Sequence, residues 1–264
     1  MFVIAILFGL LLFLLVFQLC VSILSKRGLR VLMYHKLSDS DCDELTVKVD
    51  AFEKQLLYLI KHHYQPISIE QLVQCQYIEA KLPDKPVLIT FDDGYENNYT
   101  YLYPLLKKYG LKATIFLPVG FIGKVNFWDE GNEPIMNYEK LKEMDSVFIE
   151  FGLHSFSHTN HAGLTEEELI HDIAECKVKL AENAIPFVPA IAYPYGAYPR
   201  EEKRYTKYKE ILIKNGVLLG FRIGNKINKL PISDPFSVKR IDVRGTDSFF
   251  EFKIKMLFGR VKPF

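Results

Sequence analysis

Two hydrophobic patterns alternate along the chain after its N-terminal apolar segment. Short runs rich in β-branched and aromatic residues are separated by longer stretches in which apolar residues return every three or four positions. The first pattern is typical of buried strands and the second of amphipathic helices. Strands are predicted over residues 30–34, 86–91, 113–117, 147–152, 187–193 and 217–221.

Two of the helical stretches begin with a capping-box pattern, in which an N-cap side-chain oxygen is followed three residues later by Glu. Asp50 with Glu53 predicts a helix that runs to residue 63, and Thr165 with Glu168 predicts one that runs to about residue 182. Their expected buried faces consist of Phe52, Leu56, Leu59 and Ile60 in the first helix and Leu169, Ile173, Cys176 and Leu180 in the second.

The repeated succession of strand and helix predicts an α/β fold with a parallel sheet built from βα units. Six or seven such strands favour an incomplete (β/α) barrel, with a doubly wound open sheet as the alternative. No internal repeat and no Gly/Ser linker divides residues 26–264, so we expect one catalytic domain there. In both folds the functional site should lie at the carboxyl ends of the strands.

The first 25 residues contain no charged side chain and can cross a bilayer core of about 30 Å as a helix. A cleaved signal peptide is the alternative, but the segment has neither an N-terminal Lys or Arg nor an A-x-A-like cleavage site. We therefore expect residues 1–25 to be a retained, single-pass transmembrane anchor. Lys26, Arg27 and Arg30 follow this span, which by the positive-inside tendency favours a cytoplasmic catalytic domain.

The charge pattern argues against a nucleic-acid-binding protein, and the cysteine spacing argues against a protein with metal-binding or redox-active cysteines. The formal net charge is +1 over 264 residues and both signs are interspersed, so we expect no nucleic-acid partner. Cys20, Cys42, Cys75 and Cys176 show neither CxxC spacing nor a disulfide framework. We expect them to be free thiols without a metal or redox role.

The first chemical motif is the apolar run at residues 87–91, which leads directly into Asp92, Asp93 and Gly94. Because side chains alternate along a strand, two carboxylates at its end can diverge, one toward a metal ion and one toward a water molecule. The alternative is that the two acids cap the helix that follows.

The second motif consists of His154 and His158, which follow the strand predicted at residues 147–152. In a helical turn this spacing places both imidazoles on one side, about 5 to 6 Å apart at Cβ, near enough to share a metal ion. Together with Asp93 they form a set of two histidines and one carboxylate. Such a set leaves coordination positions open and suits a hydrolytic metal.

The third motif, YPYG at residues 193–196, ends the strand predicted at residues 187–193. Such a turn can direct backbone N–H groups toward a developing oxyanion, while Tyr193 and Tyr195 contact a sugar ring. For Tyr193 the alternative is packing in the core. The irregular loop at residues 120–134, which contains Trp128, either lines a substrate cleft or packs on the surface.

In that order, TFDDG at residues 90–94, HSFSH at 154–158 and YPYG at 193–196 resemble the first three motifs of the polysaccharide deacetylases, the NodB-homology enzymes of carbohydrate esterase family 4. The segments VLMYHK at 31–36 and YQPISI at 64–69 also resemble the poly-N-acetylglucosamine deacetylase-like branch. The resemblance covers about residues 30–245. Three ordered motifs are far more specific than any one of them.

The resemblance implies that Asp93, His154 and His158 bind one divalent metal ion, commonly zinc (Zn²⁺), and that Asp92 is the general base. It also implies that the backbone N–H of Tyr195 helps to hold the oxyanion. The expected reaction is hydrolysis of an N-acyl group on a glycan or a lipid-linked sugar, which yields acetate and a free amine.

Two departures from the family pattern concern the base and the acid. Many members begin the third motif with an arginine that positions the base, whereas this chain has Ala192 there. Arg240 is our candidate to supply that charge by an ion pair with Asp92, and a surface arginine is the alternative. Many members also have a late histidine as general acid, and here His35 and His161 are the candidates, with a structural role as the alternative for His35.

These departures leave a second function open, a membrane-tethered carbohydrate-binding protein on a catalytically decayed version of the fold. A two-carboxylate glycosidase is disfavoured because Asp92 and Asp93 are adjacent, whereas the two acids of a glycosidase stand about 5 to 9.5 Å apart. Topology bears on the substrate as well. A cytoplasmic site fits a lipid-linked or nucleotide-linked precursor, whereas an external site fits finished polysaccharide, and many relatives act on exported polymers.

Overall fold

The computed structural model describes residue 9, residues 28–129 and residues 131–261. The membrane span expected at residues 1–25 therefore lies outside the described residues except for Gly9, and it stays a prediction. Within the described part of the chain, no helix is both long enough and apolar enough to cross a membrane.

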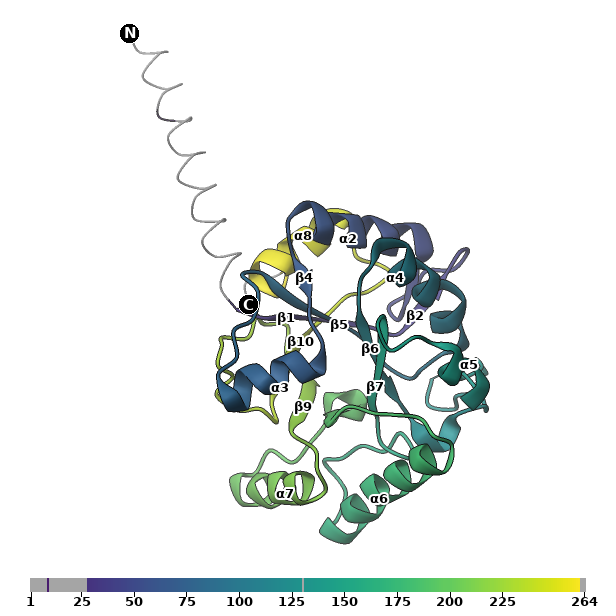
Figure 1. The fold of residues 1–264 in the computed structure, drawn as a ribbon, viewed down its shortest axis with the longest axis vertical. Helices are drawn as coiled ribbons and strands as arrows, with labels where there is room; N and C mark the ends of the chain where they lie inside the picture. Colours follow the sequence, from purple (N-terminus) through teal and green to yellow (C-terminus); the bar gives the residue numbers. More distant parts are fainter. Residues whose placement is uncertain (1–8, 10–27, 130, 262–264) are drawn as a thin grey trace.

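Seven parallel strands form a closed ring with helices around it (Figure 1). The ring closes because β1 pairs with β10 on one side and with β5 on the other, so the predicted barrel is confirmed and the open-sheet alternative is wrong. Seven strands make it incomplete beside the eight of a full β/α barrel. The strands are β1 (Arg30–Tyr34), β5 (Pro86–Phe91), β6 (Ala113–Leu117), β7 (Ile149–Leu153), β8 (Ala190–Ala192), β9 (Leu219–Ile223) and β10 (Val238–Asp242).

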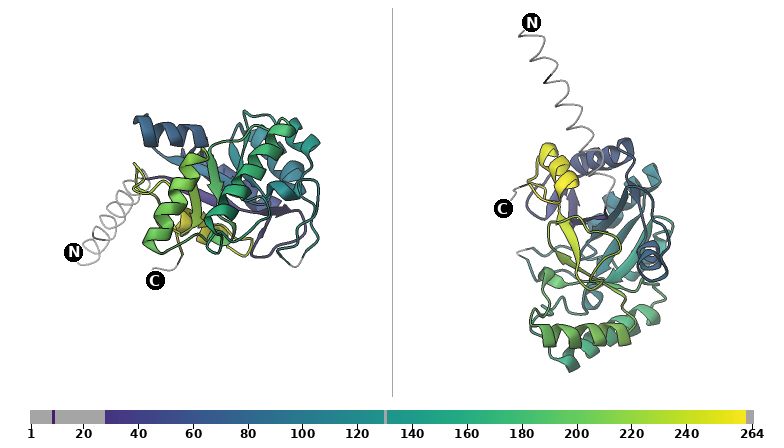
Figure 2. Two further views of the ribbon diagram at one scale, coloured as in Figure 1. Left: turned by 90° about the horizontal axis from the view of Figure 1, so that it is seen from below. Right: turned by 90° about the vertical axis from the view of Figure 1, so that its left-hand side faces the viewer.

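Shorter elements and the helices complete the domain, and Figure 2 shows the helices on the outside of the strands. β4 (Gln65–Pro66) pairs with the start of β5, and β2 (Lys36–Ser38) pairs with β3 (Thr46–Lys48) beside the barrel. The α-helices with bounds described are α2 (Val49–Lys61), α3 (Ile69–Ile78), α4 (Tyr103–Tyr109), α5 (Tyr138–Glu143), α6 (Glu166–Glu182), α7 (Glu202–Lys214) and α8 (Phe249–Phe258).

The predicted strands agree with the structure best where apolar residues are continuous. β1, β5 and β6 have the predicted bounds, while β7, β8 and β9 are displaced or shorter. β10 was not predicted because its alternate residues Arg240 and Asp242 are charged, which hides the apolar pattern of a buried strand.

Of the two predicted capping boxes, one is confirmed and one is wrong. Thr165 caps α6 through the Glu168 backbone N–H, and all four predicted apolar residues of that helix are buried. α2 begins one residue before Asp50, whose carboxylate instead accepts a hydrogen bond from Lys54 at 2.9 Å. On α2 Phe52, Leu56 and Leu59 are buried as expected, but Ile60 is 39% exposed.

Alternate strand residues form two separate buried clusters. Residues such as Leu32 and Ile89 pack under the surrounding helices. A second cluster fills the barrel interior with Val31, Leu88 and Phe116, and it also contains Ile69 of α3. The α3 helix therefore covers the end of the barrel where the strands begin, and it leaves the opposite end available for a site.

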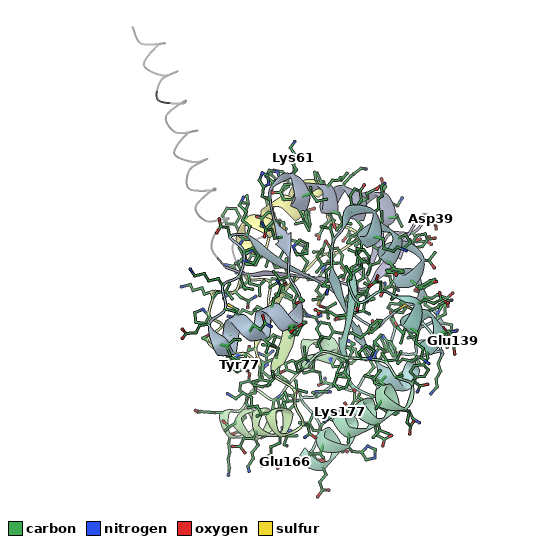
Figure 3. The ribbon with its side chains drawn as sticks, in the orientation of Figure 1. Asp39, Lys61, Tyr77, Glu139, Glu166 and Lys177 are labelled. Atoms are coloured by element: carbon green, nitrogen blue, oxygen red, sulfur yellow. The ribbon has the colours of Figure 1, made fainter. Side chains whose placement is uncertain are left out.

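One partly buried carboxylate links three elements at the end of the barrel where the strands begin. Glu150 on β7 accepts hydrogen bonds from the Ile69 backbone N–H at 2.6 Å and from Thr114 Oγ1 at 2.7 Å. Surface positions lie on the outer helices, and Figure 3 shows the side chains of Lys61 on α2 and Glu139 on α5 at the periphery of the molecule.

Candidate active site

The predicted chemical residues gather where the barrel strands end. Asp92 and Asp93 follow β5 directly, His154 follows β7, and Arg240 lies on β10. Because all strands of the barrel are parallel, their carboxyl ends meet at one mouth. The side chains of these residues are almost completely buried there.

Asp93, His154 and His158 converge on one point. His154 Nε2 lies 3.4 Å and His158 Nε2 lies 3.2 Å from Asp93 Oδ1. One ligand atom from each of the three residues lies within 4.8 Å of the other two. Asp93 Oδ1 is buried and has no hydrogen-bond partner among the described residues, which is typical of a carboxylate oxygen that faces a metal position.

His154 is oriented by a backbone carbonyl. Its Nδ1 lies 2.8 Å from the Ala192 carbonyl oxygen, which can only accept, so Nδ1 carries the proton and Nε2 presents its lone pair toward Asp93. Burial lowers the pKa of His154 to about 4, which keeps the imidazole neutral at pH 7. A neutral, oriented imidazole is the form that binds a metal ion.

The two histidines do not lie on a helical turn, so that part of the prediction is wrong. Residues 154–160 form an irregular loop, in which Ser155 and His158 have positive φ angles of 65° and 53°. Asp172 of α6 fixes this loop by accepting hydrogen bonds from Ser155 Oγ at 2.6 Å and from the Phe156 backbone N–H at 2.8 Å. Sequence reasoning missed Asp172, because nothing in its helical context indicates a buried partner.

Backbone strain is concentrated at the same mouth. Asp93 and Tyr195 also lie in the left-handed region, with φ angles of 70° and 59°. For residues other than glycine this conformation costs about 1–3 kcal/mol each, and it persists where the surrounding structure determines it. At Asp93 the turn of the backbone sends its carboxylate toward the histidines, while Asp92 keeps the inward direction of the strand.

Arg240 and Asp92 form a bidentate ion pair inside the barrel. Arg240 Nη1 donates to Asp92 Oδ1 at 2.5 Å, and Nη2 donates to Oδ2 at 2.7 Å. Burial alone would raise the pKa of Asp92, but the Arg240 guanidinium holds that pKa below its usual value. Arg240 is thus buried beside Asp92 and supplies a charge that Ala192, at the start of the third motif, does not.

The two candidate acids occupy different environments. His35 Nε2 lies 3.9 Å from Asp92 Oδ2 in the open mouth, and its backbone carbonyl accepts a hydrogen bond from Asn98. His161 is completely buried, and its Nδ1 lies 2.7 Å from the hydroxyl of Tyr208. His161 is therefore out of reach of a substrate, and His35 is the candidate that the structure brings to the site.

The two tyrosines of the third motif also differ. Tyr193 is completely buried, and its hydroxyl donates to the Phe236 carbonyl oxygen at 2.9 Å. The side chain is thus used for packing, which corrects its prediction as a sugar contact. Tyr195 is 56% exposed, and its ring lies 4.9 Å from that of His158 in an edge-on contact.

A cleft of about 280 Å³ opens over these groups. One wall is the loop at residues 120–134, where the Trp128 ring stacks on His158 with centroids 4.1 Å apart. Tyr95 donates a hydrogen bond to Asp129 of the same loop at 3.0 Å, and Lys36 lies 2.7 Å from Glu133. The loop therefore lines the cleft, which is one of the two alternatives for it in the sequence.

Residues 79–211 match the family model described as Polysaccharide deacetylase. The chain belongs to the polysaccharide deacetylase family. Among curated relatives, it is 36% identical over 174 residues to Bacillus subtilis YxkH, which is assigned to the polysaccharide deacetylases by name, and the match covers 66% of this chain. The match spans only 58% of YxkH.

A second relative supports the poly-N-acetylglucosamine deacetylase-like branch of the family. The chain is 29% identical over 232 residues to the Staphylococcus aureus (strain N315) protein named poly-beta-1,6-N-acetyl-D-glucosamine N-deacetylase, with 84% of this chain and 76% of that protein covered.

Solved structures show the same fold at lower sequence identity. IcaB from Ammonifex degensii superposes with a TM-score of 0.73 at 24% identity, covering 88% of this chain and 97% of that one. The Streptococcus pyogenes deacetylase PplD, solved with acetate, gives a TM-score of 0.71 at 23% identity, with coverages of 87% and 98%.

Within this polysaccharide deacetylase, the sequence prediction missed two further contacts at the site, in addition to those of Asp172. The carbonyl of Ala192 orients His154, yet a backbone oxygen has no sequence signal. Trp128 has one, as the only tryptophan of the chain within an irregular loop, but its contact with His158 depends on the path of that loop.

Proposed function

We propose that this chain is a metal-dependent N-deacetylase that hydrolyses N-acetyl groups on a polymer of N-acetylglucosamine. The observation that carries the proposal is the buried Asp92–Arg240 ion pair directly beside Asp93, His154 and His158. A base held in one orientation next to two imidazoles and a carboxylate is suited to the hydrolysis of an amide.

The three converging side chains fit a divalent ion. Two imidazole nitrogens and one unpartnered carboxylate oxygen face one another in a buried position, which is the ligand set of catalytic zinc sites. We assign Asp93, His154 and His158 as ligands of Zn²⁺. When bound there, the ion polarises the acyl carbonyl and lowers the pKa of a water molecule.

The side chains around this position divide the proton transfers. Asp92 is held by two hydrogen bonds from the Arg240 guanidinium. It accepts a proton from the attacking water molecule as the water oxygen bonds to the acyl carbon. The backbone N–H of Tyr195 helps to hold the oxyanion. His35 donates a proton to the amide nitrogen as the C–N bond breaks, which releases acetate and leaves the sugar with a free amine.

The aromatic walls support a glycan as the substrate. The exposed ring of Tyr195 and the ring of Trp128 each contact His158 and line the cleft, where a sugar ring can contact apolar surfaces. The name of the S. aureus relative supports N-acetylglucosamine as the sugar and acetyl as the acyl group. The decayed alternative has less support, because the charge missing at Ala192 is supplied by Arg240.

A membrane anchor at residues 1–25 is part of the proposal. The segment has no charged side chain over a length that spans a bilayer core. Lys26, Arg27 and Arg30 favour a cytoplasmic catalytic domain, whereas a polymeric substrate favours the opposite side. C-terminal reporter fusions decide between the two orientations, since each class of reporter is active on one side only.

The function is tested with the purified full-length chain in detergent. We expect about one zinc ion per chain and release of acetate from N-acetylglucosamine oligomers. His154→Ala and His158→Ala should lose both, while the control His171→Ala, an exposed position on α6, should keep both. Full metal content in the two site variants would contradict the assigned ligands, and a metal-loaded but inactive wild type would favour a binding protein.

A further inference from the structure

The barrel begins only three residues after the proposed membrane span. Lys26 and Arg27 separate Ser25 from Gly28, the first residue of the continuous described segment. A fully extended chain covers at most about 3.6 Å per residue, so Gly28 lies within about 11 Å of Ser25. The polar zone of a bilayer is about 5–7 Å thick on each side of the hydrocarbon core. The part of the barrel around Gly28 is therefore held at the lipid headgroups or within about 6 Å of them.

Gly28 is fixed to the barrel and is not part of a loose linker. The Leu29 backbone N–H donates to the Asn228 carbonyl oxygen at 2.8 Å, and the Asn228 N–H donates back to Leu29 at 2.9 Å. Arg30 Nη1 donates to the Gly28 carbonyl oxygen at 3.0 Å, and its Nε donates to the Met256 carbonyl oxygen. The anchoring point is thus part of the rigid body, and its position determines which face meets the membrane.

The surface around Gly28 has the composition of a membrane-contacting face. Gly28 lines a groove with the segment that follows α3 and with residues 230–231, and Gly259 at the end of α8 packs on residues 226–227. Ile78 is 71% exposed and Phe258 is 53% exposed beside them. We define the floor face by its exposed apolar and basic residues: Ile78, Lys81, Lys226, Lys229, Phe258 and Arg260.

The charge of the floor face favours an anionic lipid surface. Its four exposed cations exceed the two exposed acids of the same region, Glu79 and Asp84, by two. Lys26 and Arg27 add two further positive charges immediately before Gly28. An anionic leaflet attracts basic residues at the headgroups, and apolar side chains add burial in the interface.

The catalytic mouth lies at the other end of the same strand. β1 runs from Arg30 to Tyr34, and His35 follows it at the cleft. Seven residue steps from Gly28 to His35, at about 3.3 Å each in a strand, span about 23 Å. With the tilt of about 36° that is usual for barrel strands, the mouth stands about 19 Å above the floor face.

We propose that the floor face docks on the lipid surface, so that the cleft opens into water away from the membrane and accepts N-acetyl groups on an extended glycan polymer. A sugar attached to a lipid of the same membrane would present its acyl group near the headgroups, below the mouth. The proposal rests on the proposed anchor and deacetylase function, and it selects the polymer over the lipid-linked sugar.

Trp128 provides a direct test, because it is the only tryptophan of the chain and stacks on His158. The full-length protein is reconstituted in vesicles of phosphatidylcholine and phosphatidylglycerol that carry quenching labels at the headgroups. We expect no loss of Trp128 emission. Strong quenching of Trp128 would overturn the proposal, since the cleft would then lie at the membrane. This measurement needs no variant and does not depend on enzymatic activity.

The floor face is tested in a Trp128→Phe background with one new tryptophan at a time. Ile78→Trp should lose emission to the headgroup labels. The matched control is Ile170→Trp. Ile170 is 45% exposed and lies near the start of α6. Twelve residues, or about 18 Å of helix, separate it from the end of α6. The control should keep its emission. An unquenched Ile78→Trp, or equal quenching at both positions, overturns the docking.

Two further measurements separate the parts of the proposal. If the protein does not float with vesicles, the anchor and with it the docking are wrong, while acetate release from soluble oligomers still tests the deacetylase function. In the same vesicles, polymer should be deacetylated and an N-acetylglucosamine linked to a lipid should not. Comparable rates on the two substrates would overturn the assigned substrate class even if the docking is correct.

Discussion

Removing the guanidinium of Arg240 should destabilise the protein strongly. Arg240→Met keeps most of the apolar stem but removes both hydrogen bonds to Asp92, at 2.5 and 2.7 Å. Both side chains are buried, so Asp92 would be left as an uncompensated charge in the barrel. Breaking such a pair from one side costs about 3–5 kcal/mol, a large part of the roughly 5–15 kcal/mol that stabilises a typical domain.

The cause is isolated by a double-mutant cycle. Asp92→Asn alone leaves a buried guanidinium without its charge partner, so it should also destabilise. The double variant removes both charges, and its loss should be smaller than the sum of the single losses by about 1–3 kcal/mol. Arg240→Lys keeps the charge but not the planar fork, and its loss should be intermediate.

Urea denaturation of chelator-treated protein measures these differences without a contribution from metal binding. Arg240→Met within about 1 kcal/mol of the wild type would refute the reasoning, because a buried, bidentate pair cannot be lost at so small a cost. Additive single losses would show instead that each side chain acts through packing alone. Turnover of the double variant should stay absent even where its stability returns, because the base is missing.

Three further outcomes follow from the same site and its surroundings. Asp92→Asn should keep the metal but lose about 100-fold to 10,000-fold in turnover, whereas Asp93→Asn should lose both; an empty site in Asp92→Asn would show that the two roles are reversed. His35→Gln should lower turnover by a similar factor with unchanged metal content, and an unchanged rate would remove it as the acid. Burial lowers the pKa of His161 from 6.5 to about 4. Between pH 6.5 and pH 4 the His161 imidazole is therefore protonated in the unfolded chain but not in the folded one. The free energy of unfolding should fall by up to about 3 kcal/mol as the pH drops from 6.5 to 4. His161→Gln, which can still contact Tyr208, should show a weaker fall in urea denaturation, and an equal fall would assign the effect to other groups.

The sequence predicts the barrel well where burial on both faces makes a strand continuously apolar. β1, β5 and β6 have this character and were predicted with correct bounds. It predicts β10 poorly for the opposite reason, because Arg240 points into the barrel and breaks the apolar pattern. A charged residue that pairs with another buried charge thus makes its strand difficult to predict, because it interrupts the apolar pattern of the strand.

The site could be predicted as a set of residues but not as a geometry. Spacing suggested a helical turn for His154 and His158, while the structure uses a loop with positive φ angles held by Asp172. Left-handed conformations in residues other than glycine have no reliable sequence signal, because tertiary contacts impose them. The same holds for Trp128, whose contact with His158 joins two loops far apart in the chain.

The arginine that pairs with Asp92 lies on β10, whereas many family members have an arginine at the position of Ala192 on β8. In the sheet, β8 and β10 both border β9, so a long side chain from either strand can reach the centre of the barrel. Ala192 on β8 leaves that space free and contributes only its carbonyl, which orients His154. Arg240 on β10 then supplies the charge to Asp92 from the other side. Under the proposed function, we expect the position of the guanidinium relative to Asp92 to matter for the chemistry, and not the strand that carries the arginine. Inspection of position 192 alone would therefore suggest that this chain lacks the arginine, although Arg240 contacts Asp92 from another strand.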